Sequence, residues 1–295
     1  MNTTKTFKAF CFSLSAFLLL FSNTSNAQQW QNLNTKVLSA IYDGTYQSAL
    51  QDALLAQAVA EKEFNTKHPN YVCSLHNLAT AYHKLGQTEE ARFLYLQSIK
   101  IAAGKIGKDH EVYAIGLYRL ADLYQGIGQL KKASPLYKEA LVKLEKSVGG
   151  THPHYISCLN NTGKLYHKMG AHLEAEEYLL NAIDLKEKHG GWHTNDYAES
   201  INDLANLYQD IWRYDEADKL YRKSLNLRAE SVGKSHPSYA ENLNDLAKLY
   251  AQTKRYTEAE ALYLEVLDIK EKRLGKRHPS YQKSIEDLVH LHKVK

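Results

Sequence analysis

A period of 42 residues runs through almost the whole chain, and no other feature of the sequence constrains its fold as strongly. Three ladders mark the period in phase, each with one residue type at every step. They are Tyr71, Tyr113, Tyr155, Tyr197, Tyr239 and Tyr281; Gly107, Gly149, Gly191, Gly233 and Gly275; and Ala49, Ala91, Ala133, Ala175, Ala217 and Ala259. A period of about 20 to 50 residues is typical of arrays in which one supersecondary unit stacks on the next. The chain is therefore predicted to be a repeat protein.

Each period has the pattern of two helices. In the repeat that begins at Tyr239, apolar or small residues recur at the i, i+3, i+4 and i+7 spacing of an amphipathic helix. They are Leu243, Leu246, Ala247, Leu249 and Tyr250. A break at residues 252–255 follows, and Ala259, Leu262, Tyr263 and Val266 then indicate a second helix that reaches Leu274. Gly275 stands where a helix commonly ends in a left-handed residue, and Asn65 takes the equivalent place in the first repeat.

The junctions and the small residues support the same interpretation. Four junctions carry a His-Pro pair, and proline is well suited to the first position of a helix. These pairs begin at His68, His152, His236 and His278. Small residues at Ala79, Ala121, Gly163, Ala205 and Ala247 would let paired helices approach to about 8–10 Å. Each hairpin would leave half of its core open until the next repeat covered it, so we predict an all-α, right-handed α-solenoid.

We predict the following boundaries. Residues 1–27 form a signal peptide, the repeats span 28–70, 71–112, 113–154, 155–196, 197–238 and 239–280, and a capping helix spans 281–295. The first helix lacks the ladder tyrosine, as expected of a terminal repeat. Two irregularities stand out: His193 comes one residue early, so that Thr194 takes the junction position, and Pro135 lies inside a second helix, which it should bend.

The repeat resembles the tetratricopeptide repeat. In the repeat from Tyr239, the residues that carry the resemblance are Leu243, Leu246, Ala247, Tyr250, Ala259 and Tyr263. The 42-residue period and the junction Gly-Lys-x-His-Pro-x-Tyr, present at residues 233–239, resemble the repeats of kinesin light chains. The resemblance covers residues 28–295 and implies a protein that binds protein or peptide partners.

The first 27 residues have the layout of a secretory signal peptide. Lys5 and Lys8 precede an apolar stretch at residues 9–21, and Ser25-Asn26-Ala27 offers small residues at the positions before a cut. A membrane anchor is the alternative, but a bilayer span requires about 20 apolar residues. We therefore expect cleavage after Ala27, no membrane segment in the mature chain, and an exported protein, with a bacterial periplasm or secretion as the expected location.

Composition excludes several function classes. Without residues 1–27 the formal net charge falls from +4 to +2, because Lys5 and Lys8 are removed, and we expect no nucleic acid partner.

Cys73 and Cys158 are expected to be free thiols two repeats apart. The ladder tyrosines could be a stacking platform for bases or sugars, but on the apolar face of a repeat we interpret them as core.

No motif of a catalytic or cofactor site is present, so we predict a non-enzymatic protein without a cofactor. The densest group of histidines, His189 and His193 with His152 and His154, lacks the thiolates or carboxylates of an ordinary zinc site. We therefore predict no metal site.

The candidate binding surface is the inner face of the first helices. The family resemblance implies that the fifth position of each first helix faces a concave groove, where asparagine would bond the backbone of an extended peptide. This position holds His76, Tyr118, Asn160, Asn202, Asn244 and Glu286, and the position four residues on includes Lys164, Asn206 and Lys248. An amide offers both a donor and an acceptor. The alternative is that the asparagines bond neighbouring helices or water.

The charges near this face do not select the sign of a ligand. Lys164, Lys168 and Lys248 favour an acidic segment, whereas carboxylates argue for the opposite. These are Glu199, Asp203, Asp210, Glu241 and Asp245. Two hypotheses remain. The first is an exported adaptor that binds an extended peptide in the groove, and its site would consist of His76, Tyr118, the three asparagines, Lys164, Asn206 and Lys248. The second is a structural scaffold that assembles through convex or end surfaces.

Overall fold

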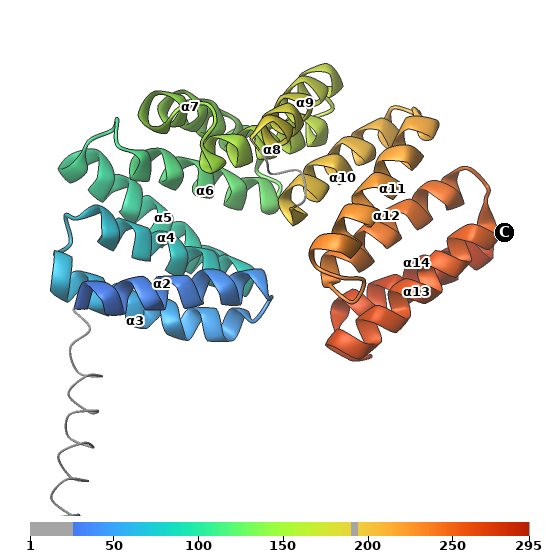
Figure 1. Ribbon diagram of the computed structural model, residues 1–295, viewed down its shortest axis with the longest axis horizontal. Helices are drawn as coiled ribbons and strands as arrows, with labels where there is room; N and C mark the ends of the chain where they lie inside the picture. Colours follow the sequence, from blue (N-terminus) through green and yellow to red (C-terminus); the bar gives the residue numbers. More distant parts are fainter. Residues whose placement is uncertain (1–25, 190–193, 295) are drawn as a thin grey trace, which may run out of the picture. The chain divides into compact units, whose positions relative to one another are not determined.

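The computed structural model describes residues 26–189 and 194–294, which form helices joined by short turns (Figure 1). They fall into two compact units that divide between Ser147 and Val148. The first unit holds α2 (Asn26–Tyr42), α3 (Tyr46–Phe64), α4 (Pro69–Lys84), α5 (Thr88–Ile101), a π-helical extension η1 (Ala102–Ile106), α6 (Glu111–Gly126) and α7 (Leu130–Val148). The second holds α8 (Pro153–Lys168), α9 (His172–Lys188), α10 (Asn195–Asp210), α11 (Tyr214–Ser231), α12 (Pro237–Gln252), α13 (Tyr256–Leu274) and α14 (Pro279–Val294).

The predicted all-α fold of helix-turn-helix repeats is confirmed. Even-numbered helices are the first helices of the repeats, and odd-numbered helices are the second. The predicted signal peptide lies outside the described residues except for its last two positions, as do the ladder residue Gly191 and His193. Within residues 26–189 and 194–294, no helix carries an apolar stretch long enough to cross a membrane.

Histidine caps explain where the first helices begin. In α4, α6, α8, α12 and α14 the imidazole Nδ1 of the preceding histidine accepts the backbone N–H two residues later, at 3.1 to 3.3 Å. Thr194 replaces histidine before α10, and its Oγ1 accepts the N–H of Tyr197 at 3.2 Å. The capping helix, predicted from residue 281, accordingly begins two residues earlier at Pro279, because His278 is its cap.

Small residues bring the two helices of a repeat together. The ladder alanines from Ala49 to Ala259 are fully buried. Gly163 of α8 is packed so closely that a Cβ atom there would lie 2.7 Å from Cγ of Leu179 on α9. In the second unit, buried side chains form a continuous core from Ala175 on α9 to Leu291 on α14.

Five of the six ladder tyrosines are buried in the cores of the two units, as interpreted from the sequence, and Tyr155 is part-buried. Tyr71, Tyr113, Tyr197, Tyr239 and Tyr281 are each at most 9% exposed. Their hydroxyls can still reach polar partners at the edge: Tyr113 donates to Glu139 at 2.9 Å, and Tyr197 contacts Glu187. Burial raises the pKa of Tyr113 to about 12. Cys73 and Cys158 form no disulfide, as predicted.

Candidate functional site

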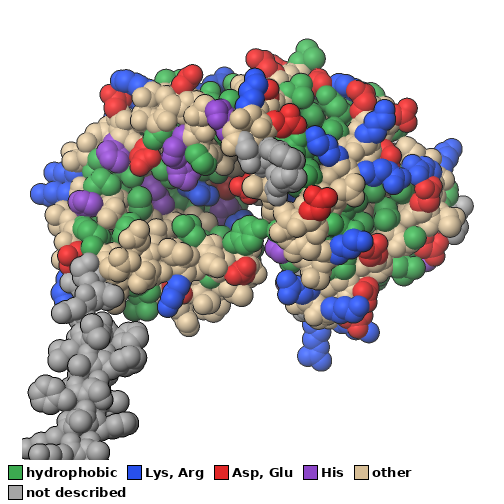
Figure 2. All heavy atoms as spheres, viewed as in Figure 1, with side chains coloured by type: hydrophobic (Ala, Val, Ile, Leu, Met, Phe, Trp, Pro, Cys, Tyr) green, Lys and Arg blue, Asp and Glu red, His purple; other side chains and the backbone are tan. Residues whose placement is uncertain are grey.

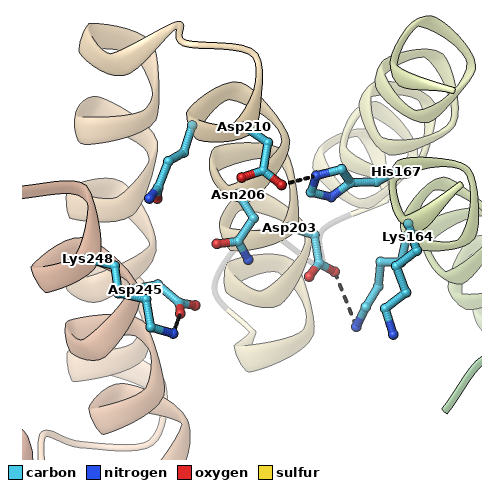
Figure 3. A pocket seen from close by; sticks show the side chains of 9 residues that line it. Lys164, His167, Asp203, Asn206, Asp210, Asp245 and Lys248 are labelled. Atoms are coloured by element: carbon cyan, nitrogen blue, oxygen red, sulfur yellow. Dashed lines mark hydrogen bonds and ion pairs between the residues drawn. The ribbon is translucent and has the colours of Figure 1, made fainter. Parts of the chain in front are cut away.

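A polar pocket of about 350 Å³ lies on the face that the first helices of the second unit form. Its lining comes from Lys164, His167 and Lys168 on α8, from Asp203, Asn206, Gln209 and Asp210 on α10, and from Asp245 and Lys248 on α12. These positions recur at three- and four-residue spacing, which places them on one side of each helix. Figure 3 shows Asn206 between Asp203 and Asp210, with Lys164 to one side and Lys248 to the other.

The three predicted asparagines lie beneath this surface rather than on it. Asn160, Asn202 and Asn244 are only 5%, 7% and 9% exposed. Asn160 Nδ2 donates to Oδ2 of Asp203 at 2.8 Å, and Asn202 Nδ2 donates to Oδ2 of Asp245 at 3.0 Å. The Oδ1 atoms of all three are buried without a hydrogen-bond partner in the described chain. Each of the first two asparagines therefore orients a carboxylate of the following repeat.

Other pairs across the repeats share this separation of 43 residues. In the second unit, His167 Nε2 lies 2.8 Å from Oδ2 of Asp210, and Gln209 donates to Gln252 at 2.9 Å. In the first unit, Asn77 donates to Asn34. The first helices are thus joined by side-chain hydrogen bonds along the face where the pocket lies.

Lysines neutralise the pocket carboxylates. Lys164 Nζ lies 3.1 Å from Oε1 of Glu199 and 3.6 Å from Oδ2 of Asp203, and Lys248 Nζ lies 3.4 Å from Oδ1 of Asp245. The Lys164 ammonium lowers the pKa of Glu199, whereas burial raises the pKa of Asp203 despite the attraction of that ammonium. Figure 2 shows the same mixture of signs over the face of α10 to α14 in view, with Lys and Arg interspersed among Asp and Glu.

Asn206 presents an amide atom to the pocket. Tyr221 Oη lies 2.5 Å from Oδ1 of Asn206 and 2.7 Å from Oε1 of Gln209. The phenol has one proton, so it can donate to only one of these oxygens. Rotating the Asn206 amide by a half turn would let its nitrogen donate to Tyr221 instead. In either orientation one polar atom of Asn206 has no hydrogen bond within the described chain.

Three cations, of which Arg228 and Lys270 are buried and Lys186 is part-buried, bond backbone carbonyls at the starts of the first helices, and the sequence analysis did not identify them. Lys186, Arg228 and Lys270 lie 42 residues apart on the second helices, so the repeat register itself could have revealed them. Lys186 Nζ donates to the carbonyl of Asp196 at 2.7 Å, and Lys270 Nζ donates to the carbonyl of Ser280 at 3.2 Å. Arg228 contacts the carbonyl of Ser238. Burial lowers the pKa of all three side chains.

Two of the predicted site residues belong to the first unit. His76 and Tyr118 are 4% and 5% exposed, and their rings lie 6.5 Å and 6.3 Å from those of Tyr95 and Tyr137. The structure therefore brings together Lys164, Asn206 and Lys248 at the pocket surface and places the other predicted residues in the interior. Among the described residues, no group of three or more His, Cys, Asp or Glu side chains could hold a metal ion.

The repeats match the tetratricopeptide repeat (TPR) over residues 32–104, 112–188 and 196–272. The chain belongs to this family. TPR proteins are protein–protein interaction modules, and the fold typically serves as a scaffold rather than as an enzyme. No curated protein sequence matches the chain significantly.

Solved structures show the same TPR architecture. A Podosopora anserina kinesin light chain-like protein with nearly identical TPR-like repeats is 26% identical, with a TM-score of 0.56 over 70% of this chain and 98% of that one. BtubC from P. vanneervenii is 21% identical, with a TM-score of 0.61 over 84% and 94%. A Rap protein complexed with Competence and Sporulation Factor is 16% identical, with a TM-score of 0.64 over 92% and 77%. The last two likenesses concern the fold alone.

Proposed function

We propose that the protein is an exported, non-enzymatic adaptor that binds an extended peptide segment of a partner protein across the first-helix face of its second unit. The observation that carries the proposal is the pocket between α8, α10 and α12, with the Asn206 amide at its centre. An amide can donate to and accept from a peptide backbone whatever side chains the peptide carries.

The charge balance of the pocket favours a peptide over a highly charged ligand. Asp203, Asp210 and Asp245 each already have a cationic or imidazole partner. Lys168 is exposed and has no ion pair among the described residues, so one ammonium remains available for an acidic side chain or a terminal carboxylate. A ligand with one carboxylate and an accessible backbone would match the Lys168 ammonium and the Asn206 amide.

The buried asparagines have a positioning role in this proposal. Asn160 and Asn202 orient Asp203 and Asp245, which in turn hold Lys164 and Lys248 beside the pocket. This arrangement differs from direct contact between those asparagines and the peptide, which the family resemblance implied. Support for ligand binding on such a fold comes from the Rap protein, whose structure is a complex with Competence and Sporulation Factor.

The export part of the proposal rests on residues 1–27, with Lys5 and Lys8 ahead of the apolar stretch and small residues before the expected cut. It predicts that the mature protein begins at Gln28 and is recovered outside the cytoplasm. Mass spectrometry of the N-terminus after cell fractionation tests this directly. An intact Met1 on a cytoplasmic chain would contradict it.

Affinity capture from the secreted and envelope fractions tests the binding site. We expect wild-type protein to retain a partner that Asn206→Ala weakens about tenfold or more. Asn226→Ala, an exposed asparagine on α11 outside the pocket, is the matched control and should bind as wild type. The triple change Asn160→Ala, Asn202→Ala and Asn244→Ala should also reduce binding, through the displaced carboxylates. Equal capture by Asn206→Ala and wild type would move the site away from this pocket.

A further inference from the structure

The turn between the two helices of each repeat contains one residue in the left-handed conformation. Four repeats place glycine there, with φ between 75° and 77°, at Gly44, Gly86, Gly128 and Gly170. The next two repeats place Trp212 and Lys254, each with φ 62°. Bulky residues rarely adopt this conformation, because the Cβ atom crowds the backbone. Trp212 is thus held in a strained conformation at a position that suits glycine.

The side chain of Trp212 projects largely into solvent. It is 75% exposed, and its indole has no hydrogen bond or ring contact with a described residue. The backbone of the turn imposes the conformation, since the N–H of Arg213 donates to the carbonyl of Tyr208 at 2.8 Å, and strained residues of this kind cluster at functional sites. Tryptophan is also enriched among the residues that dominate protein interfaces.

An apolar groove of suitable size lies on the first unit. Its volume is about 550 Å³, and it is lined by Leu54 and Gln57 on α3, Leu78 and Tyr82 on α4, and Glu89, Glu90, Phe93 and Leu94 on α5. Leu54 is 45% exposed and Phe93 is 68% exposed, whereas Leu78 beneath them is buried. The groove is open toward solvent, and its volume lies within the range of about 300–1,000 Å³ of ligand sites, so it offers an apolar surface to an aromatic side chain.

The charges around the two features are complementary. Glu90 stands at the edge of the groove, is exposed, and has no ion pair among the described residues. Lys254 occupies the turn equivalent to that of Trp212 in the following repeat, so it lies along the same edge of the second unit. It too is exposed and unpaired in the part of the chain that the structure describes.

We propose that Trp212 of one copy inserts into the α3–α5 groove of a second copy, with Lys254 facing Glu90. The two contacting surfaces are different parts of the chain, so the contact is heterologous: the copy that inserts Trp212 keeps a free groove, and the copy that receives it keeps a free tryptophan. Copies would therefore add head to tail. This goes beyond the proposed peptide binding and involves none of the pocket residues.

Sedimentation velocity of the mature protein over a wide concentration range tests the proposal. We expect the wild-type mass to rise with concentration and Trp212→Gly to weaken self-association about tenfold or more. Glycine suits the left-handed turn, so this variant should also melt at a higher temperature than wild type. Loss of association therefore could not be ascribed to unfolding. Leu173→Asp, which changes an exposed leucine on α9 outside both surfaces, should associate normally.

Mixing two variants tests the pairing itself. Phe93→Asp disrupts the groove but leaves Trp212 intact, whereas Trp212→Gly does the opposite, so neither should self-associate. A mixture of the two retains one complete contact and should form a complex of two chains and no larger species. A monomeric wild type at every concentration, normal association of Trp212→Gly, or no complex in the mixture would each overturn the proposal.

Discussion

At the scale of single residues, histidine acts in this protein as a helix cap. The ladder histidines bring an imidazole acceptor to the backbone N–H groups at the start of the first helices, a role more often filled by Ser, Thr, Asp or Asn. The repeat with Thr194 shows that a hydroxyl can substitute. The recurrence of histidine is thereby explained without a metal or a catalytic role.

The cap predicts the effect of changing His236. Alanine at this position removes the acceptor for the Ser238 N–H and should lower the free energy of unfolding by about 1 kcal/mol. Aspartate restores an acceptor of the preferred kind, so His236→Asp should retain most of the stability. Urea unfolding followed by circular dichroism measures both. Equal stability of the alanine variant and wild type would show that the cap contributes nothing.

The close packing around Gly163 allows a second prediction about stability at the scale of single residues. A Cβ atom there would lie 2.7 Å from Cγ of Leu179, so Gly163→Ala should destabilise the protein by about 1–3 kcal/mol through overpacking. The double change Gly163→Ala with Leu179→Ala relieves the clash, so its effects should be less than additive. Thermal unfolding of the two single variants and the double variant measures this coupling. Strict additivity would contradict the assigned contact.

At the scale of elements, adjacent first helices are joined by part-buried polar pairs as well as by apolar packing. The bond from Asn202 on α10 to Asp245 on α12 is 3.0 Å long, and it is available only because an amide can donate to a carboxylate. Aspartate has the same shape as asparagine but offers an acceptor in place of the donor. At position 202 it would therefore replace the attraction between α10 and α12 by a repulsion.

Asn202→Asp is therefore expected to destabilise the protein by about 1–3 kcal/mol at pH 7. The new carboxyl beside Asp245 would have a raised pKa in the folded state, because two buried charges of one sign cannot both ionise easily. Its destabilising effect should be absent below its ordinary pKa of about 4 and should grow as the pH rises. Unfolding at several pH values measures this, with Asn226→Asp on the exposed face of α11 as control. A penalty that does not change with pH would contradict the carboxylate pair.

At the scale of the whole molecule, the interactions of each repeat are with its neighbours, as expected for stacked repeats. The second unit contains its own core from α9 to α14 and every residue that lines the polar pocket. It therefore has a core of its own and the whole of the proposed binding pocket.

We expect residues 148–295, produced alone, to be helical and to unfold cooperatively. Circular dichroism and thermal unfolding of this fragment test the expectation, and capture of the same partner as the mature protein would locate binding in it. The fragment lacks the α3–α5 groove, so it should remain monomeric at concentrations where the mature protein associates. A fragment without helical structure would show that the second unit depends on the first.

The sequence alone determined the helices, their pairing and the core, because these follow from a local apolar pattern repeated every 42 residues. It also placed Lys164, Asn206 and Lys248 on one face of the first helices, since helical spacing determines which residues share a side. It left open whether Asn160 and Asn202 would contact a peptide or bond neighbouring helices, and the structure shows both bonded to carboxylates of the next repeat. Those contacts depend on the stagger of neighbouring first helices, which is set when the helices pack. For the same reason, only the tertiary structure showed what Lys186 bonds, how exposed Trp212 is and where the apolar groove of the first unit lies.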